Sequence, residues 1–396
     1  MANQPLKKKE VKTKKNLSAF KQSMGFISKD NVSIENSNAD KQIEWLLMPR
    51  GWTEAVKVNI PQGYCSTLVG FSNVGKSTVV NHAIVAAQKQ GLIPVIYDTE
   101  NNFDFTYAIN MGLEAEPIYG DVEIEEVDET TGEIIVRKEN RIVGYDGNFI
   151  YFNNNILANR YGKMDYSSGK ETKSCRKVAV IEDVAASINE LLNAQDNGEI
   201  DAGFVFVWDS VGSIGSYKSF KSAVGNNMFD AGAISTAFQG IVNDRIPRSR
   251  KVSSPYTNTM IFVNKVWLDS MTAPMAQPSL SLKGGNSIYY ASRLIVLLGG
   301  SLKAATKKLV ATSKGSNYNY GIETKIKVLK NQLPAPYTVT YEGSALCTAH
   351  GMFALDEADE YKKKYMPDIL KQLSAVANGE VINANDVTFS TEDSDE

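Results

Sequence analysis

The segment GFSNVGKS, from Gly70 to Ser77, decides the fold. It satisfies in full the pattern G-x-x-x-x-G-K-S/T of a phosphate-binding loop, or P-loop. The apolar run 67–71 before it predicts a short buried strand, and 77–91 after it predicts a helix that closes on a glycine. A loop between a strand and a helix can direct backbone N–H groups and the positive end of the helix dipole at a phosphate. A chance match in a surface loop is therefore disfavoured.

The residues of this loop have separate expected contacts. Lys76 can reach the β- and γ-phosphates, and the hydroxyl of Ser77 can ligate Mg²⁺. The sequence therefore predicts an ATPase with ATP and Mg²⁺ as cofactors. The expected ATP-binding positions run through the loop into the helix: Gly70, Phe71, Ser72, Asn73, Val74, Gly75, Lys76, Ser77 and Thr78.

The rest of the middle of the chain alternates strands and helices. The runs 92–100, 204–210 and 259–266 are continuous and apolar, as in strands buried on both faces of a parallel sheet. A helical pattern at 180–198 precedes one of them and also ends on a glycine. This order predicts an α/β fold with a mostly parallel twisted sheet flanked by helices.

Acidic residues at the ends of these strands are candidates for metal binding and catalysis. Asp209 ends FVFVWDS, where the metal-holding aspartate of a P-loop protein leaves the sheet. Glu100 closes VIYDTE and is placed to orient or deprotonate a water molecule. Asp98 competes for that role, because strand alternation turns both carboxylates to the same face. Spacing alone does not choose between them.

Composition excludes several other classes of protein. The 396 residues are 43% hydrophobic and 22% charged, with a formal net charge of −3, so the chain is not a uniformly basic nucleic-acid binder. Three cysteines without paired spacing and two distant histidines argue against a disulfide framework or a His/Cys metal site. No run approaches the roughly 18 apolar residues of a membrane span, and no secretory signal begins the chain. We expect a cytoplasmic protein, in the bacterial host cell if a phage encodes it, with no membrane partner.

Charge and turn patterns divide the chain. Residues 1–21 hold seven lysines and one glutamate, and 356–396 hold eleven acids against four lysines. We expect a basic, protomer-contacting segment at 1–50, a core at 51–345 and a helical segment with an acidic tail at 346–396. The last seven residues are expected to be disordered. Two turn signals within 120–153 predict a β-hairpin inserted into the core.

Beyond the P-loop, the chain resembles the RecA recombinase family from about Ile60 to Gly343. The resemblance rests on YDTENNFDFTYAINMG, VWDSVGSI, IFVNKV, IETKIKVLKNQLPAP and, as the most specific match, GGNSIYYASRLIVLL at 284–298. The N-terminal FKQSMGFISKDNVSI and the acidic tail look more like the UvsX recombinases of tailed phages than bacterial RecA. The resemblance implies a RecA-like ATPase core.

The resemblance also implies roles for individual residues. Glu100 takes the catalytic position, beside Lys76, and Asp104 and Tyr107 take the positions that contact adenine. Lys265 stands where the family has a glutamine or histidine that senses the γ-phosphate, and its ammonium would act there as a point charge. Lys330 matches one of two lysines that reach the ATP of a neighbouring protomer. Gln332 replaces the other.

DNA binding is expected in two loops. The first, 213–227, interleaves aromatic residues with lysines and carries Tyr217, Lys218, Phe220 and Lys221. The second, 267–286, ends in Gly284, Gly285 and Asn286, where glycines allow backbone N–H groups to approach phosphates. Ordinary surface loops are the alternative. DNA contact is favoured because each loop follows a strand that carries an ATP-site residue.

Together these features predict a DNA-dependent ATPase of recombination and repair. It would form helical filaments on single-stranded DNA and exchange strands with homologous double-stranded DNA, with mediator and single-strand-binding proteins as further partners. Phe20 of FKQSM would pack into the neighbouring protomer or, alternatively, onto its own core. Two other readings remain: a hexameric replicative helicase of the DnaB type, which normally carries an extra N-terminal domain, and an ATP-switched regulator without a DNA substrate.

Overall fold

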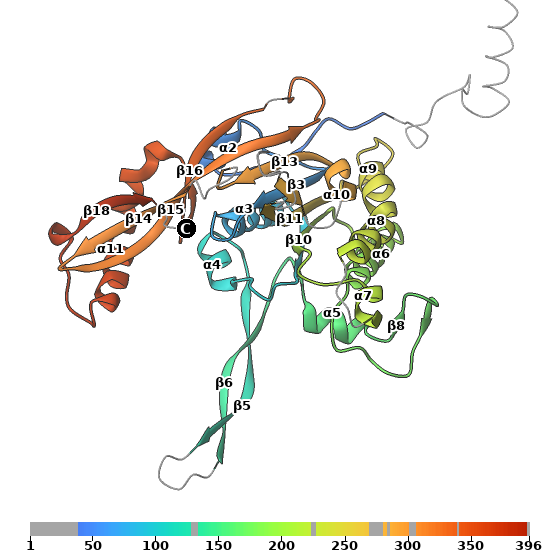
Figure 1. Cartoon of the computed structure of the whole chain (residues 1–396), viewed down its shortest axis with the longest axis horizontal. Coiled ribbons are helices and arrows are strands. Elements are labelled where there is room, and N and C mark those ends of the chain that lie inside the picture. The colour runs from blue at the N-terminus through green and yellow to red at the C-terminus, as the bar shows by residue number, and fades with distance from the viewer. Residues whose placement is uncertain are drawn as a thin grey trace, which may run out of the picture.

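A large mixed sheet organises the computed structural model (Figure 1), which describes residues 39–127, 134–222, 227–268, 280–282, 286–300, 306–338 and 340–393. In this part of the chain the sheet has twelve strands, nine of them in the order β17-β16-β15-β13-β3-β11-β10-β4-β7. The six strands at its centre and at one edge pair in parallel: β13 (Ser292–Leu298), β3 (Cys65–Gly70), β11 (Thr259–Leu268), β10 (Phe204–Val211), β4 (Ile93–Asp98) and β7 (Ile150–Asn153). The prediction of an α/β fold with a central parallel sheet is confirmed.

Alternate residues of the central strands enter two hydrophobic cores. In β10, Val205 and Val207 face one core, whereas Phe204, Phe206 and Trp208 face the other. Because both faces are covered, the strand is apolar throughout, as its sequence indicated. The first core packs against α3 (Lys76–Lys89) and α2 (Arg50–Val56), and the second against α6 (Ile181–Asp196) and α8 (Asn227–Gly240).

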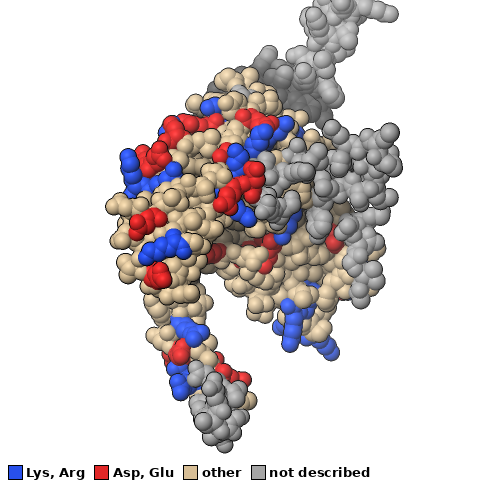
Figure 2. Space-filling view, turned by 60° about the vertical axis from the view of Figure 1, so that its left-hand side comes forward, with Lys and Arg blue, Asp and Glu red and all other residues tan. Residues whose placement is uncertain are grey.

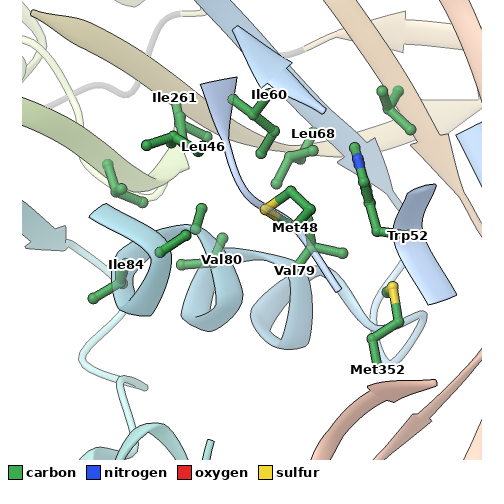
Figure 3. Packing of buried hydrophobic residues seen from close by; sticks show 14 of the residues in the cluster. Leu46, Met48, Trp52, Ile60, Leu68, Val79, Val80, Ile84, Ile261 and Met352 are labelled. Atoms are coloured by element: carbon green, nitrogen blue, oxygen red, sulfur yellow. The ribbon is translucent and has the colours of Figure 1, made fainter. Parts of the chain in front are cut away.

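Helix α3 follows the P-loop and fixes its position on the sheet. Its buried residues Val79, Val80 and Ile84 pack toward side chains of the first core (Figure 3). Among those neighbours are Leu68 of β3 and Ile261 of β11. Burial of such side chains contributes about 1.5–3 kcal/mol each. The beginning of α3 is therefore held firmly against the carboxyl ends of the strands.

A two-stranded antiparallel hairpin leaves the body as a long arm (Figure 1). Its strands are β5 (Glu116–Val127) and β6 (Ile134–Asp146). The hairpin thus begins before the expected boundary of 120, while 150–153 forms β7, an edge strand of the main sheet. Acidic and basic side chains are mixed along the arm (Figure 2), with ion pairs such as Lys138–Glu123 at 3.5 Å. This mixture explains why the sequence segment looked polar.

Antiparallel strands continue the sheet toward the C-terminus. They are β15 (Ser316–Asn331), β14 (Thr306–Ser313), β16 (Glu342–Thr348), β17 (Gly351–Phe353) and β18 (Thr388–Asp393), with α11 (Ala358–Val376) packed against them. The expectation of disorder in the last seven residues is wrong for 390–393, which belong to β18. In its register with β14, residues of opposite charge lie opposite each other, Lys307 with Asp393 and Lys308 with Glu392. Phe389 also meets the ring of Tyr320 edge-on at 5.6 Å.

Short elements complete the described chain. They are β1 (Trp45–Leu46), β2 (Ile60–Pro61), α4 (Phe105–Asn110), α5 (Asn154–Tyr161), β8 (Met164–Asp165), β9 (Lys170–Glu171), α7 (Tyr217–Ser222), η3 (Ile241–Arg245), α9 (Ile246–Ser249), β12 (Leu280–Leu282), α10 (Asn286–Ala291), η4 (Leu355–Glu357) and η5 (Ala384–Asp386). No helix in the described ranges combines the length and the apolar character that crossing a membrane requires.

His82 makes the stability of this fold dependent on pH. Its Nε2 atom accepts the backbone N–H of Met352 at 2.8 Å, which joins α3 to β17. Burial lowers the pKa of His82 to about 4, and Lys89 acts in the same direction. The unfolded chain, in which a histidine pKa is about 6.5, binds the proton more readily, so stability is complete above that pH and falls as pH decreases toward 4.

We predict that the free energy of unfolding falls by about 2–3 kcal/mol between pH 6.5 and pH 4 because of this residue. His82→Gln keeps an acceptor but cannot titrate, so its decline over the same range should be shallower by that amount. Denaturant titrations at several pH values would measure both slopes. Equal slopes in the two proteins would show that His82 does not carry the dependence.

Candidate nucleotide site

The P-loop borders a pocket at the carboxyl ends of the parallel strands. It has a volume of about 370 Å³. Its lining comes from the P-loop, α3, the ends of β4, β10 and β11, and the turn into α4, and includes Ser72, Asn73, Lys76, Ser77, Glu100, Asp104, Tyr107, Asp209 and Lys265. The structure thus brings into one pocket residues that lie far apart in the sequence and that were expected to share one site.

Two glycines of the P-loop are required by the space around them. Gly75 has φ +91°, a value that favours glycine, and a Cβ atom there would lie 2.6 Å from Sγ of Cys347. A Cβ atom on Gly70 would lie 2.5 Å from the carbonyl oxygen of Leu298. Between them, the carbonyl of Val74 accepts a hydrogen bond from Thr324 at 3.0 Å. The loop thus packs closely against β13, through Leu298, and against the antiparallel strands β15 and β16.

Lys76 lies over the loop in which a phosphate would bind. Its Nζ atom donates to the carbonyl oxygens of Gly70, at 3.1 Å, and Phe71. Burial lowers its pKa to about 8, although the nearby carboxylate of Asp209 favours the charged form. An ammonium that is partly removed from water and bonded only to carbonyls gains strongly from an incoming phosphate anion.

Asp209 and Ser77, which both line the pocket, are the residues expected to offer oxygen donors to a metal ion. Burial, together with the adjacent charge of Glu100, raises the pKa of Asp209 to about 6, although Lys76 opposes this. A divalent cation would relieve that cost. No group of three or more His, Cys, Asp and Glu side chains in the described ranges could hold a metal. One carboxylate and one hydroxyl fit Mg²⁺, which usually binds few protein ligands and completes its shell with phosphates and water.

The structure distinguishes Asp98 from Glu100. Asp98 is buried, and its carboxylate accepts the backbone N–H groups of Asn102 and Phe103, both at 2.9 Å, and the hydroxyl of Tyr151 at 2.8 Å. These bonds hold the turn that follows β4. Glu100 lies beyond the strand, so the expected strand alternation does not apply to it. Its carboxylate is the freer of the two to approach a water molecule.

Glu100 is held by one hydroxyl and one ammonium. It accepts a hydrogen bond from Ser210, and its two carboxylate oxygens lie 2.9 and 3.0 Å from Nζ of Lys265. Burial would raise the pKa of Glu100, but these two partners keep it below its ordinary value. The carboxylate is therefore ionised at neutral pH. Lys265, opposite Gly70 in the sheet register, places its charge between the P-loop and Glu100.

Tyr107 and Thr78 belong to the border with a second pocket, of about 360 Å³, on the other side of the P-loop. The hydroxyl of Tyr107 lies 2.7 Å from that of Thr78 and donates to the carbonyl of Thr348 at 2.9 Å. Asp104 caps α4 by accepting the N–H of Tyr107 at 3.0 Å. The wall formed by Tyr318, Tyr320, Gly321 and Thr348 was not foreseen. No local motif marks it, because antiparallel strands bring it to the loop.

Lys330 does not line the nucleotide pocket of its own protomer. Its Nζ atom donates to the backbone carbonyl of Tyr289 at 2.6 Å and lies 4.7 Å from the centre of that ring. The side chain thus joins β15 to α10. The expected contact with ATP of a neighbouring protomer stays a prediction.

The first expected DNA loop is partly helical. Residues 217–222 form α7, in which the ring of Tyr217 is buried and that of Phe220 is 47% exposed. A contact with α6 anchors this helix, because Glu182 accepts the N–H of Tyr217 at 2.9 Å. Lys221 pairs with Asp165 at 3.1 Å, and Lys218 lies 4.1 Å from the ring centre of Phe229. The expected stacking of a base on Tyr217 is therefore not available in this conformation.

The second expected DNA loop lies mainly outside the described residues. That holds for Gly284 and Gly285, and Asn286 is described only as the first residue of α10. The described residues on either side show how the loop is anchored. The end of β11 pairs with β12, Val266 opposite Leu282 and Leu268 opposite Leu280. A short antiparallel ladder, which starts directly after Lys265, therefore joins the two described ends of the loop.

A strand, a P-loop and a helix, with an aspartate at the end of a neighbouring parallel strand, define the class of P-loop nucleotide-binding proteins. Within it, the chain is similar to RecA proteins over a short segment. It is 37% identical over 60 residues to Protein RecA of Aquifex aeolicus, covering 15% of this chain and 17% of the relative. For Chlorobaculum tepidum the identity is 40% over 55 residues (14% and 16%), and for Thermotoga petrophila 35% over 75 residues (17% and 21%).

The chain thus matches about a fifth or less of the length of these relatives. No protein-family profile matches it. The matches support a relationship to the RecA family, and the large α/β sheet fits a RecA-like core. A closer likeness to the UvsX recombinases stays a prediction.

The two carboxylates can be separated by experiment. Glu100→Gln keeps the size of the side chain and one acceptor oxygen but removes the base, so ATP turnover should fall by at least about 100-fold. Asp98→Asn keeps an acceptor for the turn and should retain turnover within about tenfold. Steady-state ATPase rates and nucleotide affinity would be measured for both variants. Loss of turnover in Asp98→Asn with normal turnover in Glu100→Gln would reverse the assignment.

Proposed function

We propose that this protein is an ATP- and Mg²⁺-dependent recombinase that forms filaments on single-stranded DNA and promotes homologous pairing and strand exchange. The observation that carries the proposal is the ion pair between Lys265 and Glu100. It joins the strand that enters the second expected DNA loop to the carboxylate beside the phosphate site.

Hydrolysis of ATP needs three functions at this site. The P-loop and Lys76 bind the phosphates, and Ser77 and Asp209 would hold Mg²⁺, which neutralises charge on the transferred group. Glu100 orients or deprotonates the attacking water. Its lowered pKa keeps it ionised, and its place in the pocket lining, with Lys76 and Asp209, supports access to a bound γ-phosphate. The chain's own residues thus supply binding, metal ligation and a base.

Lys265 gives the site a means to detect the γ-phosphate. Its ammonium pairs with Glu100, at 2.9 Å, in the structure. A γ-phosphate in the pocket carries more negative charge than one carboxylate and would draw Lys265 toward the P-loop. This exchange would release Glu100 to act on water. It would also shift the strand end at Val266, where the ladder with β12 begins.

The contact between Lys265 and Glu100 would also link DNA binding to the nucleotide state. Because the second expected DNA loop is anchored directly after Lys265, the nucleotide state can change how the loop is presented. The likeness to RecA proteins supports DNA as the ligand of the loops. A filament is the assembly in which ATP would lie between protomers, with Lys330 approaching from the neighbour. A cytoplasmic location, homologous double-stranded DNA, mediator proteins and single-strand-binding proteins belong to this proposal.

The affinity for single-stranded DNA tests the proposal. Wild-type protein should bind DNA more tightly with a non-hydrolysable ATP analogue than with ADP, and the coupling is expected to be about 5- to 150-fold. Lys265→Ala should keep its ADP affinity and lose most of that difference. Lys265→Gln can still contact the γ-phosphate by hydrogen bonds and should restore part of it.

Fluorescence anisotropy of a labelled oligonucleotide would give each affinity at one fixed salt concentration, because phosphate contacts depend strongly on salt. No DNA binding by the wild-type protein in either nucleotide state would refute the recombinase assignment. A full nucleotide effect in Lys265→Ala would instead refute only the role of Lys265.

A further inference from the structure

A separate pocket of about 410 Å³ lies between α5, the beginning of α6 and α7. Its lining combines apolar surface with polar and charged groups, among them Asn154, Asn155, Lys177, Val178, Ser213 and Phe220. Val178 and Phe220 are 50% and 47% exposed, although large apolar side chains are usually buried in a monomer. Such a lining suits a flat aromatic ring with polar edges.

The chain around this pocket is basic. The segment that connects α5 to α6 contains β8 and β9 and exposes Lys163, Lys170, Lys173 and Lys177. Figure 1 shows this segment beside α5 and α7. The one arginine of this segment, Arg176, is buried and pairs with Asp183. Within the part of the chain that the structure describes, Lys173 and Lys177 make no ion pair, so their charges are free to meet a phosphate.

The pocket walls are held in place by buried polar contacts. Arg176 binds Asp183 through two hydrogen bonds, both of 2.8 Å, and donates to the carbonyl of Tyr161 at 3.2 Å. The same guanidinium lies 6.0 Å from the ring centre of Phe220. This charge pair fixes the connecting segment on α6, and Glu182 of α6 holds α7 by accepting the N–H of Tyr217 at 2.9 Å. The exposed ring of Phe220 is therefore presented in a defined position at the pocket.

Two residues of the lining are bonded to Thr99, which precedes Glu100. Ser213 donates to the hydroxyl of Thr99 at 2.6 Å, and the amide of Asn154 donates to the carbonyl of Thr99 at 3.0 Å. The N–H of Thr99 in turn donates to the carbonyl of Asp209 at 2.8 Å. Thr99 thus connects this separate pocket to the backbone that carries Glu100 and Asp209.

We propose that this pocket binds one unstacked nucleotide of single-stranded DNA and reports its presence to Glu100 through Thr99. The base lies against Phe220 and Val178, with its polar edge toward Asn155, and its phosphate meets Lys177. Occupation shifts Ser213 and Asn154, and through them the backbone on which Glu100 is carried. This inference rests on the proposed function, because it names a subsite for its DNA and a route by which DNA stimulates hydrolysis.

Binding to normal and base-free DNA tests the pocket. Wild-type protein should bind a labelled oligo-dT more tightly than an oligonucleotide of equal length with abasic positions. Phe220→Ala should lose about 5- to 100-fold of affinity for oligo-dT, the range expected for loss of base stacking, and should no longer distinguish the two oligonucleotides. Lys177→Ala should weaken both and reduce the salt slope by about 0.7. Lys170→Ala is the matched control, because Lys170 lies on the same segment but outside the pocket lining, and its base discrimination should match that of wild type.

The link to Glu100 is tested by DNA-stimulated ATPase rates. Ser213→Ala removes the hydroxyl that contacts Thr99 and should lower the stimulation by DNA at saturation by at least about tenfold, while oligo-dT affinity changes less than threefold. If wild-type protein binds and is stimulated by DNA but Phe220→Ala behaves like Lys170→Ala, the pocket inference is wrong and the proposed function stands. If wild-type protein neither binds DNA nor responds to it, the proposed function fails first.

Discussion

The parallel alignment of four strands is the constraint on which the site depends. In the sheet register Lys265 lies opposite Gly70, and Asp209 lies opposite Asp98. Parallel neighbours end at the same edge, so residues from segments separated by more than a hundred positions meet at the mouth of one loop. The two hydrophobic cores fix this register, since a slip by one residue would exchange the residues on the two faces of β10.

Positively and negatively charged side chains line the pocket together at that edge. Lys76 and Lys265 lie close to Asp209 and Glu100, and their charges act on the pKa of Asp209. Burial favours a lower pKa for Lys76 and a higher one for Asp209. Both effects show that burial disfavours the charged forms of these two residues. A triphosphate would bring negative charge to Lys76, and Mg²⁺ would bring positive charge to Asp209. The pair Lys265–Glu100 is the part of this balance that the arrival of a γ-phosphate would change most directly.

Local patterns predicted the parts of the fold that depend on local chemistry. The P-loop, the buried strands at 204–210 and 259–266 and the helix after Ser77 are each specified by a continuous segment. Contacts made by distant chain segments were not visible in this way. The surroundings of Asp98 depend on Tyr151 and on the turn at Asn102, and the acidic end of the chain pairs with β14 as the strand β18. Helix α7 is anchored by Glu182, from a helix earlier in the chain.

The central claim is that ATP binding turns this protein into an assembly on single-stranded DNA. Electron microscopy of the full chain with single-stranded DNA, Mg²⁺ and a non-hydrolysable ATP analogue tests it most directly. The account predicts open helical filaments that follow the DNA, and their loss when ADP replaces the analogue. Closed rings would indicate a helicase-like motor, and isolated protomers under both conditions would indicate a switch without a DNA substrate. Either result would contradict the account.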